Sequence, residues 1–310
     1  MPSFSRIVKE EIVYNDFTDS NEKALICALI KITGTLDHSL LTIRSENAKI
    51  ASKAFKIIKK HYHSDIEIVV SRKMKLKKNN VYYLKVKEAS IIIEDLYTLK
   101  EEGSYPKEKL LQTSDDIRAY LAGIFLGCGS VNDPSTSNYH LEMSLSEEYM
   151  AEYVKDLMNQ YELNAKIIKR RNKFVVYIKS AEKIGDFLRA IGAYQSVMNF
   201  EITRIDRSMA NTINRWNNCD IANEEKAMSA SQKQIDHIAY VMDQAGLEVL
   251  DPKTREIAYL RLENPELTLN ELAEVYYETT GQTISKSGLH HRFKKIEQEA
   301  MRLQSMEEHK

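Results

Sequence analysis

An internal duplication is the feature that most constrains the fold of this chain. Residues 21–33 and 117–128 are two apolar helical runs, and each ends at a glycine, Gly34 or Gly129, that suits a helix C-cap. The same order of elements follows each glycine: an extended segment, an amphipathic helix, a hairpin and a short helix. The two copies lie about 95 residues apart, and such repetition predicts pseudo-two-fold symmetry within one domain.

The bounds of the repeated elements follow from the period of their apolar residues. In the first copy they are 38–45, 46–61, a hairpin of 65–70 with 81–87, and 91–99. In the second copy they are 139–146, 147–161, a hairpin of 165–169 with 174–179, and 184–191. Helices and antiparallel hairpins together predict an α+β fold class.

The rest of the chain is predicted to be helical. A helix over 199–215 is followed by a polar stretch without periodicity at 217–225, where we place the boundary between two domains. The expected layout is a duplicated domain over 1–216, with repeats at about 20–100 and 114–192, then the linker over 217–230 and an all-α domain over 231–310.

Four helices are predicted in this last domain from their start signals. They cover 232–245, 252–262, 269–279 and 285–303. Ser231 with Gln234, and Thr268 with Glu271, have the spacing of capping boxes. Asp251 followed by a proline also marks a helix start.

The last two helices have the pattern of a helix-turn-helix. Each carries an apolar stripe at helical spacing: Leu269, Leu272, Ala273 and Tyr276 on the first, and Leu289, Phe293, Ile296 and Ala300 on the second. Gly281 between them can take the positive φ of a tight turn, so the two stripes can pack at a large crossing angle. The last helix, which begins at about Ser285, is then the one expected to enter a DNA groove.

Polar and cationic side chains gather at the start and on the outer face of that last helix. The candidates for base or phosphate contact are Ser285, Lys286, Ser287, His290, His291, Arg292, Lys294 and Lys295. Residues near the start of a recognition helix contact base edges, and cations along it neutralise phosphates. The alternative is a small helical bundle with an ordinary solvated outer face.

Composition sets broader limits. The formal net charge of −1 neither demands nor excludes nucleic-acid binding. The three widely separated cysteines lack the spacing of zinc or redox sites, which favours a reducing cytoplasm. No stretch approaches the roughly 20 apolar residues that a membrane span requires. We therefore expect a soluble cytosolic protein without a cofactor, a bound metal or a membrane partner.

The second apolar helix resembles the LAGLIDADG motif of homing endonucleases in its sequence Leu121-Ala122-Gly123-Ile124-Phe125-Leu126-Gly127-Cys128-Gly129, and residues 27–34 look like a worn copy. In that family the acid before the final glycine of each motif holds divalent metal for cleavage. Thr33 and Cys128 stand at those positions here, and neither replaces a carboxylate as a magnesium ligand. The resemblance thus implies the fold without catalytic residues, whereas a residual nuclease would have to use Asp37 and Asp133.

Both predicted hairpins have basic tips. The first holds Arg72, Lys73, Lys75, Lys77 and Lys78, and the second holds Lys166, Lys169, Arg170, Arg171 and Lys173. At symmetry-related places, such tips could straddle a duplex and add salt-sensitive affinity without reading its sequence. Ordinary solvated loop tips are the alternative.

The chain as a whole is similar to the WhiA family, described as sporulation transcription regulators or cell-division proteins. The most specific pieces are Ser3-Phe4-Ser5 with Lys9-Glu10-Glu11, Leu121-Ala122-Gly123, Asn214-Arg215-Trp216-Asn217-Asn218-Cys219-Asp220 with Asn223, Thr268-Leu269-Asn270-Glu271-Leu272-Ala273, and Ser285-Lys286-Ser287-Gly288-Leu289-His290-His291-Arg292. The resemblance implies a duplicated, degenerate LAGLIDADG homing-endonuclease-like α/β domain followed by a helix-turn-helix domain similar to the promoter-reading region of sigma factors.

The same resemblance implies a function. It points to a nucleoid-associated protein that binds double-stranded DNA, is linked to cell division and chromosome segregation, and has no nuclease activity. The alternative is a division-associated adaptor, whose duplicated domain holds protein partners from the division or transcription machinery.

Overall fold

The chain folds into two compact units, Met1–Ser208 and Met209–Lys310. The computed structural model describes residues 2–72, 80–96, 98–99, 105–106, 108–136 and 138–307. Within these residues, no helix combines the length and the apolar character needed to cross a membrane.

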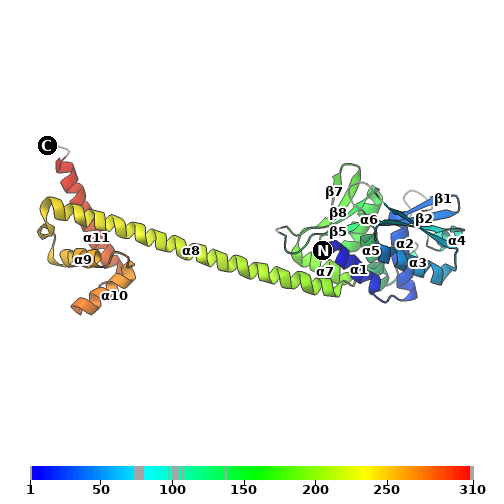
Figure 1. The fold of residues 1–310 in the computed structure, drawn as a ribbon, viewed down its shortest axis with the longest axis horizontal. Coiled ribbons are helices and arrows are strands. Elements are labelled where there is room, and N and C mark those ends of the chain that lie inside the picture. The colour runs from blue at the N-terminus through cyan, green and yellow to red at the C-terminus, as the bar shows by residue number, and fades with distance from the viewer. Residues whose placement is uncertain are drawn as a thin grey trace. The chain divides into compact units, whose positions relative to one another are not determined.

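The first unit contains the same succession of elements twice (Figure 1). The first copy consists of α2 (Asp19–Thr33), β1 (Gly34–Asp37), β2 (Leu40–Ser45), α3 (Ala48–Tyr62), β3 (Ile66–Arg72), β4 (Asn80–Val86) and α4 (Ser90–Leu96). The second, after a 3-10 turn at Glu108–Leu110, consists of α5 (Ser114–Cys128), β5 (Gly129–Val131), β6 (Leu141–Leu145), α6 (Glu148–Asn159), β7 (Lys166–Arg170), β8 (Lys173–Ile178) and α7 (Ala181–Ala190). The predicted duplication is confirmed, and β1 and β5 are additional strands in each copy.

Each copy forms one antiparallel four-stranded sheet with the same topology. The strand orders are β1-β2-β4-β3 and β5-β6-β8-β7. Leu41 lies opposite Val86 in the first sheet, as Leu141 lies opposite Ile178 in the second, and all four side chains are buried. Because side chains alternate along a strand, one face of each sheet packs on the core and the other points outward.

The two motif helices, α2 and α5, pack along each other more extensively than any other pair of helices in the described part of the chain. Their close approach depends on small residues. A Cβ placed on Gly123 would overlap the backbone oxygen of Leu25 and lie 2.7 Å from Cβ of Ala28, and one on Gly127 would lie 2.8 Å from Ile32. Glycine at these two positions therefore allows the helix backbones to meet.

Glycine is needed at the two capping positions because a side chain would not fit there, and not because the backbone is left-handed. Gly34 and Gly129 end their helices as expected, but both are extended, with φ of −87° and −74°. A Cβ on Gly129 would overlap the ring of Phe125, and one on Gly34 would lie 2.5 Å from the oxygen of Ile30. The tight entry into β1 and β5 is what excludes a larger residue.

Helix α1 (Phe4–Tyr14) was not predicted from the sequence. It buries Phe4, Val8 and Ile12, which lie four residues apart, and packs against α3, α5 and β5. The Ser5 hydroxyl donates to the carbonyl of Val131 at 2.7 Å and accepts from its amide at 2.8 Å. This side chain therefore occupies the hydrogen-bonding groups of a residue in β5.

The predicted linker over 217–230 is wrong as a secondary-structure assignment. These residues belong to α8 (Tyr194–Ala245), together with the helices expected at 199–215 and 232–245. Apart from Ala222 and Ala227, residues 217–230 are exposed, so no buried face imposes an apolar period on them. The predicted capping box at Ser231 is also wrong, because Ser231 lies inside α8 and its hydroxyl donates to the carbonyl of Pro265.

Three further helices of the second unit agree with the sequence prediction: α9 (Pro252–Glu263), α10 (Leu269–Thr280) and α11 (Lys286–Glu307). A 3-10 turn at Leu247–Val249, which precedes them, was not predicted. Asp251 caps α9, and Thr268 and Glu271 form a complete capping box on α10. Gly281 ends α10 with a φ of 71°, as the tight turn requires.

Candidate nucleic-acid interface

The predicted apolar stripes of α10 and α11 pack together in the core of the second unit. Leu272 and Tyr276 of α10 are buried, as are Leu289, Phe293, Ile296 and Ala300 of α11. Leu269 and Ala273 lie partly buried at the edge of the same cluster. This packing turns the opposite side of α11 toward solvent, which is the arrangement that a groove-reading helix needs.

Ser285 caps the start of α11. Its hydroxyl accepts from the amide of Gly288 at 3.1 Å, and its carbonyl accepts from the amide of Leu289 at 2.9 Å. The hydroxyls of Ser285 and Ser287 also lie 3.0 Å apart. The helix therefore begins where the sequence predicts, and the Ser285 hydroxyl already has a structural partner.

The outer side of α11 carries a row of exposed polar residues over its first three turns. They are Lys286, Ser287, His290, His291 and Lys294. Within the described residues, no carboxylate forms an ion pair with Lys286 or Lys294. At 1.5 Å per residue the row is about 12 Å long, comparable to the width of the major groove of B-DNA.

Arg292 and Lys295 are engaged inside the second unit. The Arg292 guanidinium donates to Oδ1 of Asp251 at 2.7 Å and to the hydroxyl of Thr254 at 3.1 Å, and Nζ of Lys295 lies 3.4 Å from Oδ2 of Asp251. The hydrogen bond from the Thr254 hydroxyl, with further help from the two cations, lowers the pKa of Asp251 to about 2. Arg292 and Lys295 therefore connect α11 to the start of α9. Lys286 and Lys294 differ from them, because they form no ion pair with a described carboxylate.

Asp251 should stabilise the second unit in a pH-dependent way. Asp251→Ala removes the α9 cap and the link to α11, and we expect the free energy of unfolding to fall by about 1–2 kcal/mol at pH 7. Because the folded pKa lies below the unfolded value, this stabilisation is present above about pH 4 and is lost as the pH falls toward about 2.

Urea unfolding at several pH values measures this contribution. Asp236→Ala is the matched control, because among the described residues Asp236 accepts a hydrogen bond from the side chain of Gln232 on its own helix and from no other group. The gap between wild type and Asp251→Ala should narrow below about pH 4 and close near pH 2, while Asp236→Ala stays near wild type throughout. A gap that does not change with pH would contradict the assignment of Asp251.

The ends of the two motif helices carry neutral groups. The Thr33 hydroxyl donates to the carbonyl of Leu29 at 2.7 Å, and the Cys128 thiol lies 3.5 Å from the carbonyl of Ile124. Burial raises the pKa of the Cys128 thiol to about 11, so it stays protonated at neutral pH. Neither group is an anionic ligand for a metal ion.

The two alternative acids take part in local structure. The Asp37 side chain is exposed at the end of β1, and its nearest ionic neighbour is His38 at 3.9 Å. Asp133 accepts from the amide and the hydroxyl of Ser135, at 2.9 and 2.6 Å, which lowers its pKa. The Asp133 carboxylate therefore stabilises a turn through these two hydrogen bonds.

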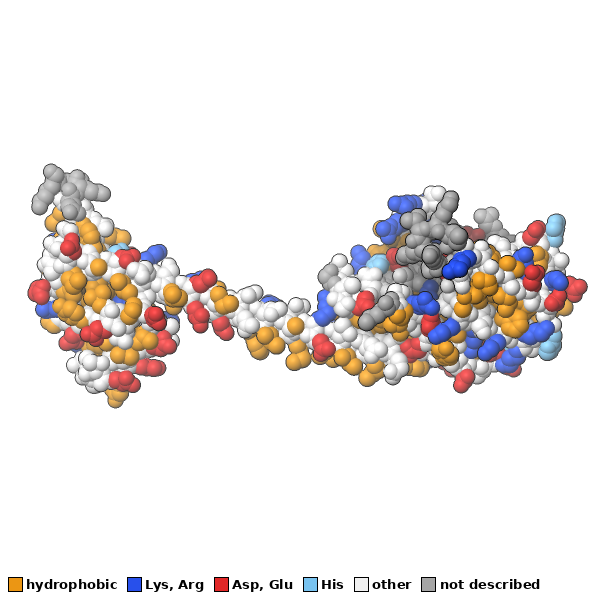
Figure 2. All heavy atoms as spheres, in the orientation of Figure 1, with side chains coloured by type: hydrophobic (Ala, Val, Ile, Leu, Met, Phe, Trp, Pro, Cys, Tyr) orange, Lys and Arg blue, Asp and Glu red, His pale blue; other side chains and the backbone are white. Residues whose placement is uncertain are grey.

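The β7–β8 hairpin has a basic end, where Lys and Arg side chains gather in Figure 2. Lys166, Arg170 and Lys173 lie on the outward face of the sheet, since Lys166 pairs with Tyr177 and Arg170 with Lys173. Lys169 lies on the other face, 5.3 Å from the centre of the Phe174 ring, and Arg171 is in the turn with a φ of 56°.

The first hairpin tip is described only in part. Arg72 ends β3 opposite Asn80 and is exposed. Lys73, Lys75, Lys77 and Lys78 lie outside the described residues. The predicted symmetry of the two basic tips therefore stays a prediction.

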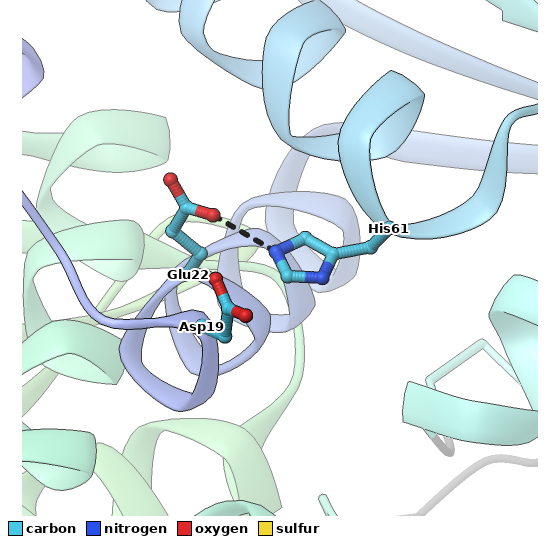
Figure 3. Close-up of side chains that lie close together, drawn as sticks. All are labelled: Asp19, Glu22 and His61. Atoms are coloured by element: carbon cyan, nitrogen blue, oxygen red, sulfur yellow. Dashed lines mark hydrogen bonds and ion pairs between the residues drawn. The ribbon is translucent and has the colours of Figure 1, made fainter.

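Three possible metal-ligating side chains meet on the side of α2 and α3: Asp19, Glu22 and His61 (Figure 3). Their ligand atoms lie within 4.8 Å of one another, and Nε2 of His61 is 2.8 Å from Oε2 of Glu22. Nζ of Lys60 donates to Asp19 at 2.6 Å and to Glu22 at 2.8 Å. Lys60 pairs with both carboxylates, so this cluster works as an ion-pair network between α2 and α3.

Comparison with known protein families accounts for almost the whole chain. Residues 19–99 match the model of the WhiA N-terminal LAGLIDADG-like domain, residues 117–210 that of the WhiA LAGLIDADG-like domain, and residues 213–300 that of the WhiA C-terminal HTH domain. The chain belongs to the WhiA family. Family membership confirms the predicted fold class, a duplicated LAGLIDADG-like domain followed by a helix-turn-helix domain.

Other WhiA-family proteins resemble the chain over its full length. The "probable cell division protein WhiA" of Listeria welshimeri is 43% identical, covering 98% of this chain and 96% of the relative, and that of Staphylococcus carnosus is 41% identical, covering 98% of both. Among solved structures, full-length WhiA from Thermatoga maritima is 25% identical with a TM-score of 0.61, covering 97% of this chain and 99% of that one. The relatives' names thus associate the family with cell division.

Proposed function

We propose that this WhiA-family protein is a DNA-binding regulator linked to cell division and chromosome segregation, and that it reads double-stranded DNA with α11. The observation that carries the proposal is the exposed row Lys286, Ser287, His290, His291 and Lys294 on the outer side of a packed helix-turn-helix. The match to an HTH domain model and the names of the relatives support it. The proposed location is the nucleoid in the cytoplasm.

The residues of the interface have different proposed roles. Lys286, Ser287, His290 and His291 lie at the start of α11, where donors and acceptors reach base edges. Lys294, two turns along, contacts a phosphate. Arg292 and Lys295 act as positioning residues through Asp251. Lys166 and Arg170 on the outward face of the second sheet add backbone contacts that do not depend on sequence.

We also propose that the protein does not cleave DNA. Thr33 and Cys128 offer no anionic ligand at the motif ends, and Asp133 is held in a turn. Purified protein incubated with supercoiled plasmid and magnesium should leave the plasmid intact. Cleavage that disappears in an Asp37→Asn, Asp133→Asn variant would contradict this part of the proposal.

Fluorescence anisotropy with a labelled duplex tests the DNA-binding role. The triple change Lys286→Ala, His291→Ala, Lys294→Ala should weaken binding by roughly 10- to 100-fold and reduce the salt slope by about 1, because the phosphate-neutralising charge of Lys294 is lost. Lys233→Ala, an exposed lysine on α8 of the same unit, is the matched control and should bind like wild type. Unchanged affinity of the triple variant would overturn the proposal.

A further inference from the structure

A cavity of about 750 Å³ lies in the first unit at the C-terminal ends of the two motif helices. Its walls come from α1, from the last turns of α2 and α5, and from the starts of α3 and α6. Thr33 and Cys128 both line it. A cavity of this size lies within the range that small-molecule ligands occupy, roughly 300–1,000 Å³.

Three lysines from separate elements line this cavity without an ionic partner. They are Lys9 of α1, Lys31 of α2 and Lys173 of β8. Among the described residues, no carboxylate lies within ion-pair distance of any of the three. Two arginines that also line the cavity do have partners: Arg6 pairs with Glu10 at 2.7 Å, and Arg44 pairs with Glu46 at 2.6 Å. Glu147 is the one described carboxylate of the lining besides Glu46, so the three lysines leave the described wall of the cavity with an excess of positive charge.

Lys9 is the lysine that most strongly indicates an anion site, because its side chain is largely removed from water. Its Nζ lies 5.7 Å from the centre of the Phe125 ring, and burial lowers the pKa of this lysine. Both Lys9 and Lys173 lie near enough to Cys128 to lower the pKa of its thiol electrostatically. A desolvated ammonium group costs free energy, and an anion between Lys9 and Lys173 would offset that cost.

Backbone donors and neutral groups complete the lining. The first turn of α6 borders the cavity, and its N-cap residue, Glu147, makes no side-chain hydrogen bond to the helix amides. Such amides suit an oxyanion. Glu46 and Glu147 are the carboxylates of the lining, and Glu46 is engaged by Arg44. The rest of the wall is apolar: Leu29, Ile43, Ile50, Leu126 and Met150.

We propose that this cavity binds a phosphate ester of about mononucleotide size, with the phosphate between Lys9 and Lys173 and the organic part against the apolar wall. The chemistry is that of recognition alone, because Thr33 and Cys128 provide neither a metal ligand nor a base. The proposal concerns the first unit, and it does not depend on DNA binding by α11.

Isothermal titration of the full-length protein with pyrophosphate and with adenosine monophosphate, at constant ionic strength, tests this site. Wild type should bind saturably with one site per chain. Lys9→Met and Lys173→Met should each weaken binding by roughly tenfold, as expected when one charged hydrogen bond is lost. Lys155→Met, which removes a lysine paired with Glu152 on the outer side of α6, should bind like wild type.

Three results would overturn the proposal. The first is that neither probe binds saturably at millimolar concentration. The second is that Lys155→Met weakens probe binding as much as the two cavity variants do. The third is that a DNA duplex displaces the bound probe, which would assign the cavity to a backbone phosphate. Because Lys173 is exposed on β8, its variant keeps the test valid even where thermal melting finds Lys9→Met misfolded. DNA binding by the α11 triple variant is measured separately. A negative result for the cavity therefore does not contradict DNA binding by α11, and the reverse also holds.

Discussion

Replacing Gly123 with leucine should unfold the first unit. The new side chain would start from a Cβ that already overlaps the backbone oxygen of Leu25 and lies 2.7 Å from Ala28. Because these contacts belong to the backbone and the first side-chain atom of α2, rotamer changes cannot relieve them. We expect the free energy of unfolding of this unit to fall by about 3 kcal/mol or more.

Thermal and urea unfolding followed by circular dichroism measures the loss. Gly185→Ala is the matched control, because a Cβ there would meet only the carboxylate of Glu201, the mobile end of a side chain. Alanine also favours the helix, so this control should stay within about 1 kcal/mol of wild type. A Gly123→Leu protein as stable as the control would show that α2 and α5 do not pack as described.

Replacing Arg261 with methionine should destabilise the second unit by about 2–4 kcal/mol. Arg261 is only 1% exposed, and its guanidinium donates to the carbonyls of Asn264 at 3.1 Å and Leu267 at 2.6 Å. It also lies 5.5 Å from the centre of the Phe293 ring in α11. Methionine keeps much of the volume but leaves two carbonyls without this donor, so the α9–α10 loop loses its anchor.

Proteolysis and DNA binding report this effect together. The second unit of Arg261→Met should become sensitive to protease and lose duplex binding, while the first unit stays folded. Arg302→Met is the control, because Arg302 forms an exposed pair with Glu299 on the same helix, and such pairs contribute little. Equal stability of the two variants would contradict the role given to Arg261.

The sequence was sufficient for the features that depend on local apolar periods. The duplicated order of elements and the apolar stripe from Leu289 to Ala300 follow from one buried face per helix or strand, and the structure confirms them. The Thr268–Glu271 capping box and the turn at Gly281 were likewise predictable, since each depends on residues a few positions apart.

Features without a local signal were missed. The helix over 217–230 exposes nearly all of its side chains, so packing leaves no pattern there. The bond between Arg292 and Asp251 joins residues 41 positions apart, and the hydrogen bond from Ser231 to Pro265 spans 34. Spacing rules cannot reveal such pairs. The sequence alone therefore does not separate Arg292 from Lys286 and Lys294, and it gives Ser231 and Gln234 the spacing of a capping box.

The cavity lysines illustrate the same limit. Lys9 comes from α1, a helix whose apolar residues at Phe4, Val8 and Ile12 do carry a helical signal that could have been found. Its position beside Cys128, about 120 residues later, depends on how α1 packs against α5. Only the tertiary structure brings these groups to one cavity.

Chromatin immunoprecipitation with sequencing, comparing wild type with the Lys286→Ala, His291→Ala, Lys294→Ala variant at equal abundance, tests the central claim most directly. If α11 reads DNA, wild type should occupy discrete chromosomal sites, and the variant should lose them while the Lys233→Ala control retains them. Identical occupancy by the wild type and the triple variant would contradict the assignment of α11 as the recognition helix.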